Sequence, residues 1–280
     1  MGGKRYAALS LASSATLTLA KGVAALLTNS LAIWAETFDS ILDIVNTAMG
    51  FAAIEWSSKP PDLDHAYGHG KVESLVAYTE TVFIFGVIGY IVYESIQRML
   101  SPKTLGWIEG GLHVLLVTMV ADALIALVNY HGYKKTDSHV LRANYVNFMG
   151  DVGRALVVIV SLHLYKLGYL IADPLFSLFI ASLLGKEGYE LLRETTHVLL
   201  DAVPRGVPEK AREIALGVDG VIEVRSVRAR SLGKGVYLDI VVGVDAEQNV
   251  EEAHRIASEV ENRIKAEFRD ADVVVHVEPA

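Results

Sequence analysis

Long apolar stretches constrain this chain most, because six of them follow one another between positions 6 and 191. Each approaches or exceeds the roughly 20 residues that a helix needs to cross the hydrocarbon core of a bilayer. They are Tyr6–Leu27, Leu31–Trp56, Val72–Leu100, Leu105–His131, Val140–Leu167 and Leu170–Leu191. The composition, 52% hydrophobic and only 21% charged, is also typical of a chain with membrane-spanning helices. The sequence therefore predicts a membrane protein with a six-transmembrane-helix bundle and both chain ends on one side.

The basic residues between the stretches indicate which side that is, since Lys and Arg prefer the cytoplasmic side of a membrane. One side carries Lys4, Arg5, Lys59, Lys71, Lys134, Lys135 and Arg142, and the other carries Arg98, Lys103 and Lys166. We therefore expect cytoplasmic termini, with the plasma membrane as the default location. A signal peptide is the alternative for the first stretch, but no small-residue cleavage pattern follows it.

From Val203 onward the pattern becomes that of a small soluble domain. Strands and helices are indicated by the periodicity of the apolar residues and by turn residues between them. The expected elements are a helix at Glu209–Leu216, strands at Val221–Ala229 and Val236–Val244, a helix at Val250–Phe268 and a strand at Val273–Val277. This αββαβ order predicts a ferredoxin-like α+β domain. We expect a membrane domain over 1–202 and a cytoplasmic domain over 203–280.

Two features of composition exclude whole classes of function. The chain has no cysteine, which rules out disulfide scaffolds, thiolate zinc sites and cysteine nucleophiles. Any bound metal must therefore use nitrogen or oxygen ligands. The net charge of -8 gives no overall basic surface for nucleic acid, so no nucleic-acid partner is expected.

Carboxylates inside the apolar stretches carry the chemistry. Asp39 and Asp43 lie four residues apart in the second stretch, and Asn147 and Asp151 repeat that spacing in the fifth. Residues four apart share one face of a helix. An ionised carboxylate at the bilayer centre costs at least about 2.5–3.5 kcal/mol, so each face needs a cation, protons or water. Four oxygen donors from two helices are suited to a divalent metal ion.

The alternative is that these aspartates pair with a buried base, and Arg154 is available three residues after Asp151. One arginine cannot neutralise three aspartates, so the metal site is favoured. Glu36, Glu80 and Asp122 also fall within predicted spans. They could relay protons or join helices, and no definite role is assigned to them.

The connection between the second and third stretches contains a second candidate site. Asp62, His65 and His69 lie close together there. Three nitrogen and oxygen ligands, with a fourth position left to water, suit a transition metal. Either histidine alone would be an ordinary surface residue.

Several motifs together resemble the cation diffusion facilitator family of divalent metal transporters. They are the Asp39/Asp43 pair, the run from Tyr67 to Ser74, the Asn147/Asp151 pair, and Ala172-Asp173-Pro174 at the start of the sixth stretch. The resemblance extends over nearly the whole chain and includes the cytoplasmic domain.

The resemblance implies a role for each matching position. Asp39, Asp43, Asn147 and Asp151 match the family's transport site, and Asp62, His65 and His69 match the ligands of its loop site. His254, His276 and Glu278 fall on or near the binuclear metal site of the cytoplasmic domain, which lies near the contact of a homodimer. Arg225 and Val241 replace histidines found in relatives with the full binuclear site, so we expect only one of its two ions to be held well.

A further departure concerns the metal. Zinc-transporting relatives usually have histidine where this chain has Asn147, which leaves an all-oxygen site. Carboxylate and carbonyl ligands favour harder ions such as Mn²⁺. We therefore expect Mn²⁺ as the preferred substrate, with Fe²⁺ or Zn²⁺ next.

The expected function is proton-coupled efflux of a divalent transition metal by alternating access. Protons compete for the same carboxylates, because ligands must lose their protons to bind metal. Two other classes remain as alternatives. One is an intramembrane metalloenzyme, for which a His-Glu-x-x-His motif is absent. The other is a membrane-tethered metal sensor that works through its cytoplasmic domain.

Overall fold

The computed structural model describes residues 2–136, 139–232, 235–268 and 270–280. The chain forms two compact units, one of Met1–Ala48 with Glu80–Glu190 and one of Met49–Thr79 with Leu191–Ala280. The first unit is helical, and the second holds the only sheet in the described residues.

The described residues before Leu200 form six long helices joined by shorter connections. They are α1 (Gly2–Thr28), α2 (Leu31–Ser57), α3 (Val72–Leu100), α4 (Ile108–Thr136), α5 (His139–Lys166) and α6 (Ala172–Leu199). Each coincides with one predicted stretch. Helix α6 continues eight residues beyond the predicted end at Leu191, because a helix can extend through polar residues that a hydropathy pattern does not count.

Three of these helices are long and apolar enough to cross a membrane, judged over the described residues: Val72–Leu100, Ile108–Lys135 and Asn144–Lys166. Helix α2 differs because Glu36, Asp39 and Asp43 interrupt its apolar sequence. The transmembrane helical domain is confirmed, while the number of six crossings stays a prediction.

The outer surface of α4 shows how this unit meets lipid. Leu116, Val117, Leu124 and Val128 each expose between 53% and 70% of their surface. Such a continuous apolar patch is unusual on a soluble protein and is expected where helices face hydrocarbon. The interior of the unit holds the polar groups instead, among them Lys21, Glu36 and Asp39.

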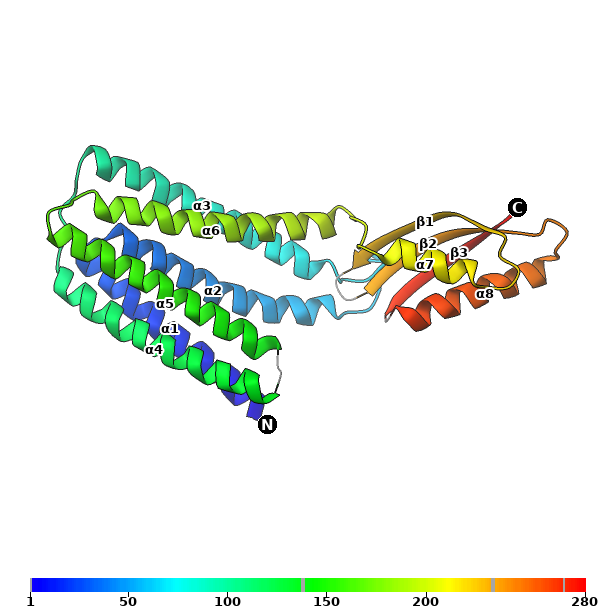
Figure 1. Ribbon diagram of the computed structural model, residues 1–280, viewed down its shortest axis with the longest axis horizontal. Coiled ribbons are helices and arrows are strands. Elements are labelled where there is room, and N and C mark those ends of the chain that lie inside the picture. The colour runs from blue at the N-terminus through cyan, green and yellow to red at the C-terminus, as the bar shows by residue number, and fades with distance from the viewer. Residues whose placement is uncertain (1, 137–138, 233–234, 269) are drawn as a thin grey trace. The chain divides into compact units, whose positions relative to one another are not determined.

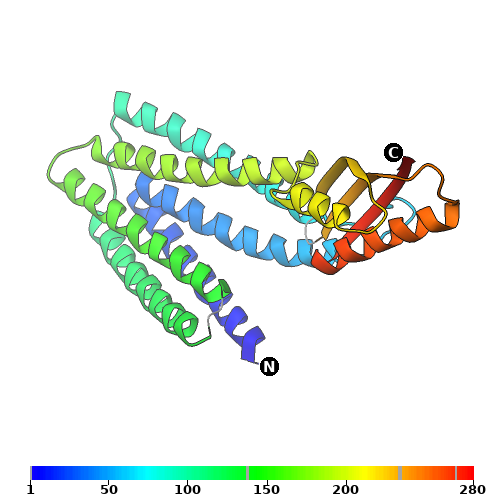
Figure 2. The ribbon, with the colours of Figure 1, turned by 45° about the vertical axis from the view of Figure 1, so that its right-hand side comes forward.

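Packing within the unit brings distant helices side by side. Figures 1 and 2 both show α3 running alongside α6. Gly188 of α6 allows this approach, because an added Cβ there would lie 2.9 Å from the side chain of Ile84. Helix α4 packs along α5 and α1.

The start of α2 is fixed by a residue from another helix. Asp173, in the first turn of α6, accepts hydrogen bonds from the hydroxyl of Ser30 and from the backbone N–H groups of Leu31 (2.8 Å) and Ala32 (3.2 Å). The first N–H groups of a helix lack partners within it, and a carboxylate there also complements the helix dipole. Asp173 is buried, and Arg98 lies 3.6 Å from its second oxygen. This contact gives a structural role to the Ala172-Asp173-Pro174 motif.

The C-terminal domain, from α7 to β3, has the two layers that the sequence predicted. Its elements are α7 (Val207–Leu216), β1 (Glu223–Leu232), β2 (Gly235–Val244), α8 (Val250–Glu267) and β3 (Ala271–Pro279). Strand β2 is central, antiparallel to β1 and parallel to β3, and α8 forms the crossover that a parallel pair requires. The αββαβ ferredoxin-like prediction is confirmed.

One apolar core holds the C-terminal domain together. Leu238, Ile240 and Val242 alternate along β2 and pack against Ile256 and Ile264 of α8, all of them at most 1% exposed. Val273, Val275 and Val277 of β3 face the same core. Alternate strand residues face opposite sides of a sheet, so the residues between these core positions point away from the helices.

We predict that Asp173→Ala will destabilise the protein. Two buried N–H groups at the start of α2 would lose their acceptor, at about 1–3 kcal/mol for each group left unsatisfied. The thermal unfolding midpoint of the full-length protein in detergent should fall, followed by tryptophan fluorescence. Asp173→Asn, which keeps one acceptor oxygen, should have a smaller effect.

The matched control is Asp219→Ala, which removes an exposed aspartate from the C-terminal unit. Equal midpoints for Asp173→Ala, Asp219→Ala and the unaltered chain would contradict the capping role of Asp173.

Candidate metal sites

Helices α2 and α5 bring together the acidic residues that the sequence singled out. Carboxylate oxygens of Asp39, Asp43 and Asp151 all lie within 4.8 Å of one another. Asp39 and Asp151 are buried, and Asp43 is half-buried. Three anionic oxygens at this spacing repel one another strongly unless a cation lies among them. The arrangement is that of an oxygen-rich cation site.

Asn147 joins this group through Asp43. Its side-chain amide nitrogen donates a hydrogen bond to Oδ2 of Asp43 at 3.2 Å. The amide carbonyl oxygen takes no part in that bond, and Asn147 is exposed. The structure therefore places all four predicted residues at one point between α2 and α5.

Arg154 also enters the site, as the alternative interpretation of these aspartates foresaw. Its Nη2 lies 2.7 Å from Oδ2 of Asp39 and 2.7 Å from Oδ1 of Asp151. One guanidinium carries a single positive charge, so it leaves two of the three carboxylate charges without a counter-ion.

A second buried charge cluster lies where α1, α2 and α4 meet. Nζ of Lys21 is 3.0 Å from Glu36 and 3.6 Å from Asp122, and it donates a hydrogen bond of 3.3 Å to Ser40. All four side chains are buried. Both acids were expected within the spans from the sequence, whereas Lys21 was not among the predicted residues. Its position inside the first apolar stretch could have indicated a buried ion pair, because a lysine there needs a partner of opposite charge as much as a carboxylate does.

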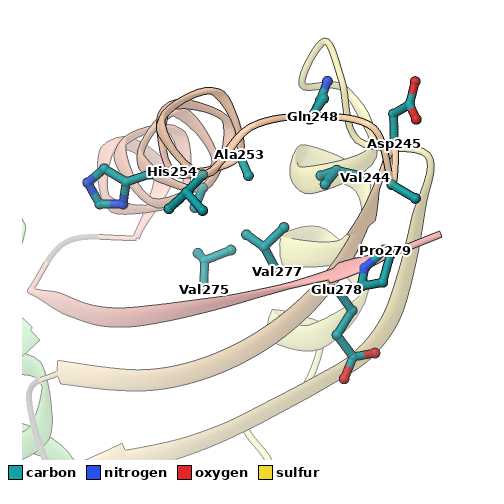
Figure 3. Close-up of a pocket in the computed structure, with 12 residues that line it drawn as sticks. Val244, Asp245, Gln248, Ala253, His254, Val275, Val277, Glu278 and Pro279 are labelled. Carbon is teal, nitrogen blue, oxygen red and sulfur yellow. The ribbon is translucent and has the colours of Figure 1, made fainter.

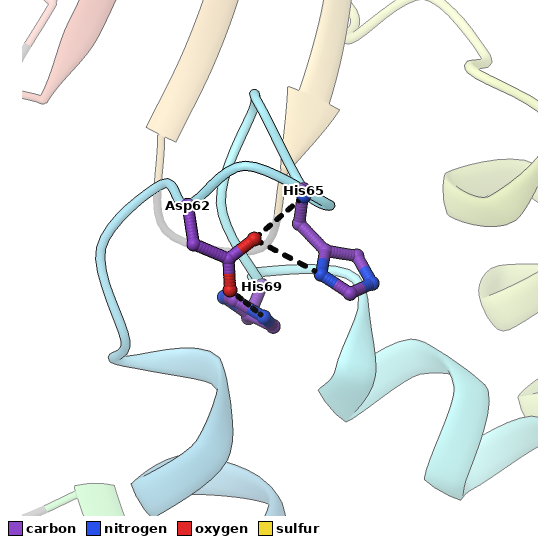
Figure 4. Close-up of side chains that lie close together, drawn as sticks. All are labelled: Asp62, His65 and His69. Carbon is purple, nitrogen blue, oxygen red and sulfur yellow. Dashed lines mark hydrogen bonds and ion pairs between the residues drawn. The ribbon is translucent and has the colours of Figure 1, made fainter.

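The loop between α2 and α3 gathers Asp62, His65 and His69 as predicted (Figure 4). Oδ1 of Asp62 accepts backbone hydrogen bonds from Asp64 (3.0 Å) and His65 (2.7 Å) and lies 3.3 Å from Nδ1 of His65. Its Oδ2 lies 3.4 Å from Nε2 of His69. The backbone N–H of His65 is the main cause that lowers the pKa of Asp62, so this carboxylate is readily ionised.

Backbone geometry and burial complete the loop site. Gly68 has φ of 79°, a left-handed conformation that glycine adopts without strain, and it turns the chain between the two histidines. His69 is only 8% exposed, and its Nδ1 is buried without a hydrogen-bond partner among the described residues. The three ligand atoms lie within 4.8 Å of one another, which suits one ion.

Contacts that the sequence did not reveal hold this loop within its unit. Tyr67 meets the ring of Tyr237 edge-on, and Arg230 lies over the Tyr67 ring at 4.5 Å from its centroid. Lys71 donates a hydrogen bond of 2.8 Å to Asp201, which lowers the pKa of that carboxyl. These partners are more than 100 residues apart, so no local pattern signals them.

Of the three candidates of the C-terminal domain, His276 and Glu278 lie side by side, whereas His254 belongs to α8. His254 and Glu278 both line an open cavity of about 430 Å³, but the carboxylate of Glu278 points away from α8, on the opposite face of β3 (Figure 3). His276 shares that opposite face, since Val275 and Val277 face the core. Nε2 of His276 is 3.6 Å from Glu278, and Glu278 also pairs with Arg225.

Two family models match the chain. The first, described as the cation efflux transmembrane domain, matches residues 7–200. The second, described as the cytoplasmic domain of cation efflux proteins, matches residues 203–280.

Relatives match over nearly the full length as well. The cation-efflux pump FieF of Shewanella oneidensis is 30% identical over 271 residues, which cover 96% of this chain and 92% of the relative. FieF of Pectobacterium atrosepticum is 29% identical over 253 residues, covering 90% of this chain and 84% of the relative. A solved MamM-CTD structure is 33% identical to this chain, covers 26% of it and 95% of its own chain, and has a TM-score of 0.26.

The two domain matches and the full-length relatives agree with the order of motifs along the chain and with the acidic site between α2 and α5. The protein therefore belongs to the cation diffusion facilitator family of cation efflux proteins, which carry divalent metal ions.

Proposed function

We propose that this protein exports a divalent transition metal from the cytoplasm in exchange for protons, at the site formed by Asp39, Asp43, Asn147 and Asp151. The observation that carries the proposal is the clustering of three carboxylates within 4.8 Å inside a transmembrane domain. Two full-length relatives are named cation-efflux pumps. The metal enters while the three carboxylates are ionised, and a change in helix packing opens the site to the other side.

Proton coupling follows from the chemistry of the ligands. A carboxylate that binds a metal must be ionised, so protons arriving from the opposite side compete for the same oxygens and release the ion. The site then returns protonated, which avoids carrying uncompensated charge through a medium of low dielectric. The working unit is a homodimer in the plasma membrane, with both termini in the cytoplasm.

The preferred metal is Mn²⁺ in this proposal, with Fe²⁺ and Zn²⁺ next. Asn147 supplies a neutral oxygen where an imidazole would favour zinc, and the other ligands are carboxylates. The Asp62, His65 and His69 cluster, with two imidazoles, is proposed as a second metal site of different character. In the C-terminal domain, a metal that uses His254 together with His276 would need the two faces to come from two copies of the domain.

We predict that Asp43→Asn will abolish transport. In proteoliposomes with an imposed pH gradient, the rate of Mn²⁺ movement against protons should fall by more than about tenfold, because the site loses a charged ligand. The movement is followed with an enclosed metal-sensitive dye. The unaltered protein should transport faster when the side that receives the metal is acidified.

The control is Glu55→Gln, an acid-to-amide change on the exposed surface of the same helix. Transport by Asp43→Asn at the unaltered rate would contradict the site, and would favour a sensor or a metalloenzyme. Metal flux that ignores the pH gradient in the unaltered protein would contradict proton coupling.

We predict that Asn147→His will shift selectivity toward zinc. An imidazole nitrogen replaces an amide oxygen at the same position, and nitrogen ligands favour Zn²⁺ over Mn²⁺. The ratio of Zn²⁺ to Mn²⁺ transport rates in the same vesicles should rise. Asn46→His, at an exposed position of α2, is the matched control. An unchanged ratio in Asn147→His would show that another feature sets the preference.

We predict that His69→Ala will remove one bound metal per chain. In an Asp43→Asn background, elemental analysis after loading with Zn²⁺ should give less metal, since the buried ligand of the loop cluster is lost. His163→Ala, an exposed histidine of α5, serves as the control. Equal metal content in both variants would contradict the loop site.

A further inference from the structure

We propose that Arg154 is a tethered cation that occupies the metal position of the unloaded transport site, so that an arriving metal ion must displace it. This inference rests on the proposed function and adds a residue that sets the affinity of the site. It concerns the described side chains of α2 and α5 alone.

The first support is position. One nitrogen, Nη2 of Arg154, lies at 2.7 Å from both Asp39 and Asp151. A transition metal bound to the same two oxygens would lie about 2.0–2.2 Å from each. The arginine nitrogen and a metal ion bound to these oxygens would both lie between the two carboxylates. The guanidinium nitrogen and the metal ion therefore cannot occupy the site together.

The second support is that the guanidinium fits the site incompletely. Arg154 is 8% exposed and Asp39 is 5% exposed, so neither is solvated by bulk water. Among the described residues, no hydrogen bond reaches Nε of Arg154 or Oδ2 of Asp39. Nη2 donates a hydrogen bond to Oδ1 of Asp151, so the guanidinium satisfies one of the two carboxylates and leaves the other without a hydrogen bond. Here the contact to Asp39 is electrostatic, which leaves that oxygen ready for another cation.

The third support is that the guanidinium lies against a glycine, which has no side chain to hold it in place. The guanidinium lies over the backbone of Gly150, where an added Cβ would be 3.4 Å from Nη1. Arginine has a long flexible side chain, so its head group can withdraw from the carboxylates without any change in the helix backbone.

Charge gives the reason for the arrangement. Three ionised carboxylates and one guanidinium leave two negative charges, which one divalent ion neutralises completely while the guanidinium stays nearby. In the unloaded state the guanidinium keeps Asp39 and Asp151 from repelling each other. The apparent affinity for metal is then the intrinsic affinity reduced by the fraction of molecules in which Arg154 has withdrawn.

The test compares Arg154→Gln with the unaltered chain. The full-length protein is used in a His65→Ala/His69→Ala background, which removes the loop ligands, and Mn²⁺ is titrated by calorimetry. If Arg154 occupies about nine of ten unloaded sites, the apparent Kd in Arg154→Gln falls about tenfold. In vesicles, the half-saturating Mn²⁺ concentration and the maximal rate should both fall, because release becomes slower.

Controls separate this role from a structural one. Arg142→Gln makes the same change at an exposed position of α5 and should leave the Kd unchanged. Arg154→Lys keeps the charge and should bind metal with an affinity between those of Arg154→Gln and the unaltered chain. Arg154→Met provides the same test as Arg154→Gln if the latter does not fold.

One result would contradict the inference. A folded Arg154→Gln or Arg154→Met with equal or weaker metal affinity would show that Arg154 only supports the structure. Failure of the proposed function has a different signature, since Asp39→Asn would then leave Mn²⁺ binding intact in the same background.

Discussion

The structure of the helical unit depends on how acidic side chains are accommodated away from water. Five of them, Glu36, Asp39, Asp43, Asp122 and Asp151, lie in two neighbouring clusters, and the basic groups that face them are Lys21 and Arg154. Removing an ion from water costs several kcal/mol even in a relaxed protein. These two clusters therefore set five acidic groups against two basic ones. Mobile cations, either metal ions or protons, are the natural complement.

Helix α2 connects the two clusters. Asp39 and Asp43 face α5, whereas Glu36 and Ser40 face Lys21 on α1. Residues three or four apart in a helix lie on neighbouring parts of its surface, so both clusters move with one rigid element. Asp173 fixes the start of that element, eight residues before Asp39. Any repacking that turns the metal site also changes the surroundings of Lys21.

The sequence could predict whatever depends on local spacing. The four-residue spacing of Asp39 and Asp43 gave one helical face, and the same spacing at Asn147 and Asp151 gave the other. The loop cluster was predicted because its three residues lie within eight positions of the chain. The six helices and the αββαβ order followed from hydrophobic periodicity, which is also local.

Contacts between distant positions were beyond such reasoning. Ser30 and Asp173 are 143 residues apart, and nothing near either one signals that a carboxylate caps the next helix. His254 and Glu278 are a different case. The alternation along β3 places His276 and Glu278 on the face that points away from α8, the helix that carries His254. The family resemblance named those residues together, while strand geometry separates them within one chain.

Under the proposed function, the permanent positive charge of Arg154 also bears on which ions the site carries. A guanidinium does not lose its proton in a protein, so Arg154 contributes one fixed charge in every state. The remaining two negative charges match a divalent ion, whereas a monovalent ion would leave one of them without a counter-ion in a medium of low dielectric. Ligand type then selects among divalent ions, with oxygen favouring the harder ones. Under the proposed function, charge balance and ligand chemistry thus select the ion separately, Arg154 through the first and Asn147 through the second.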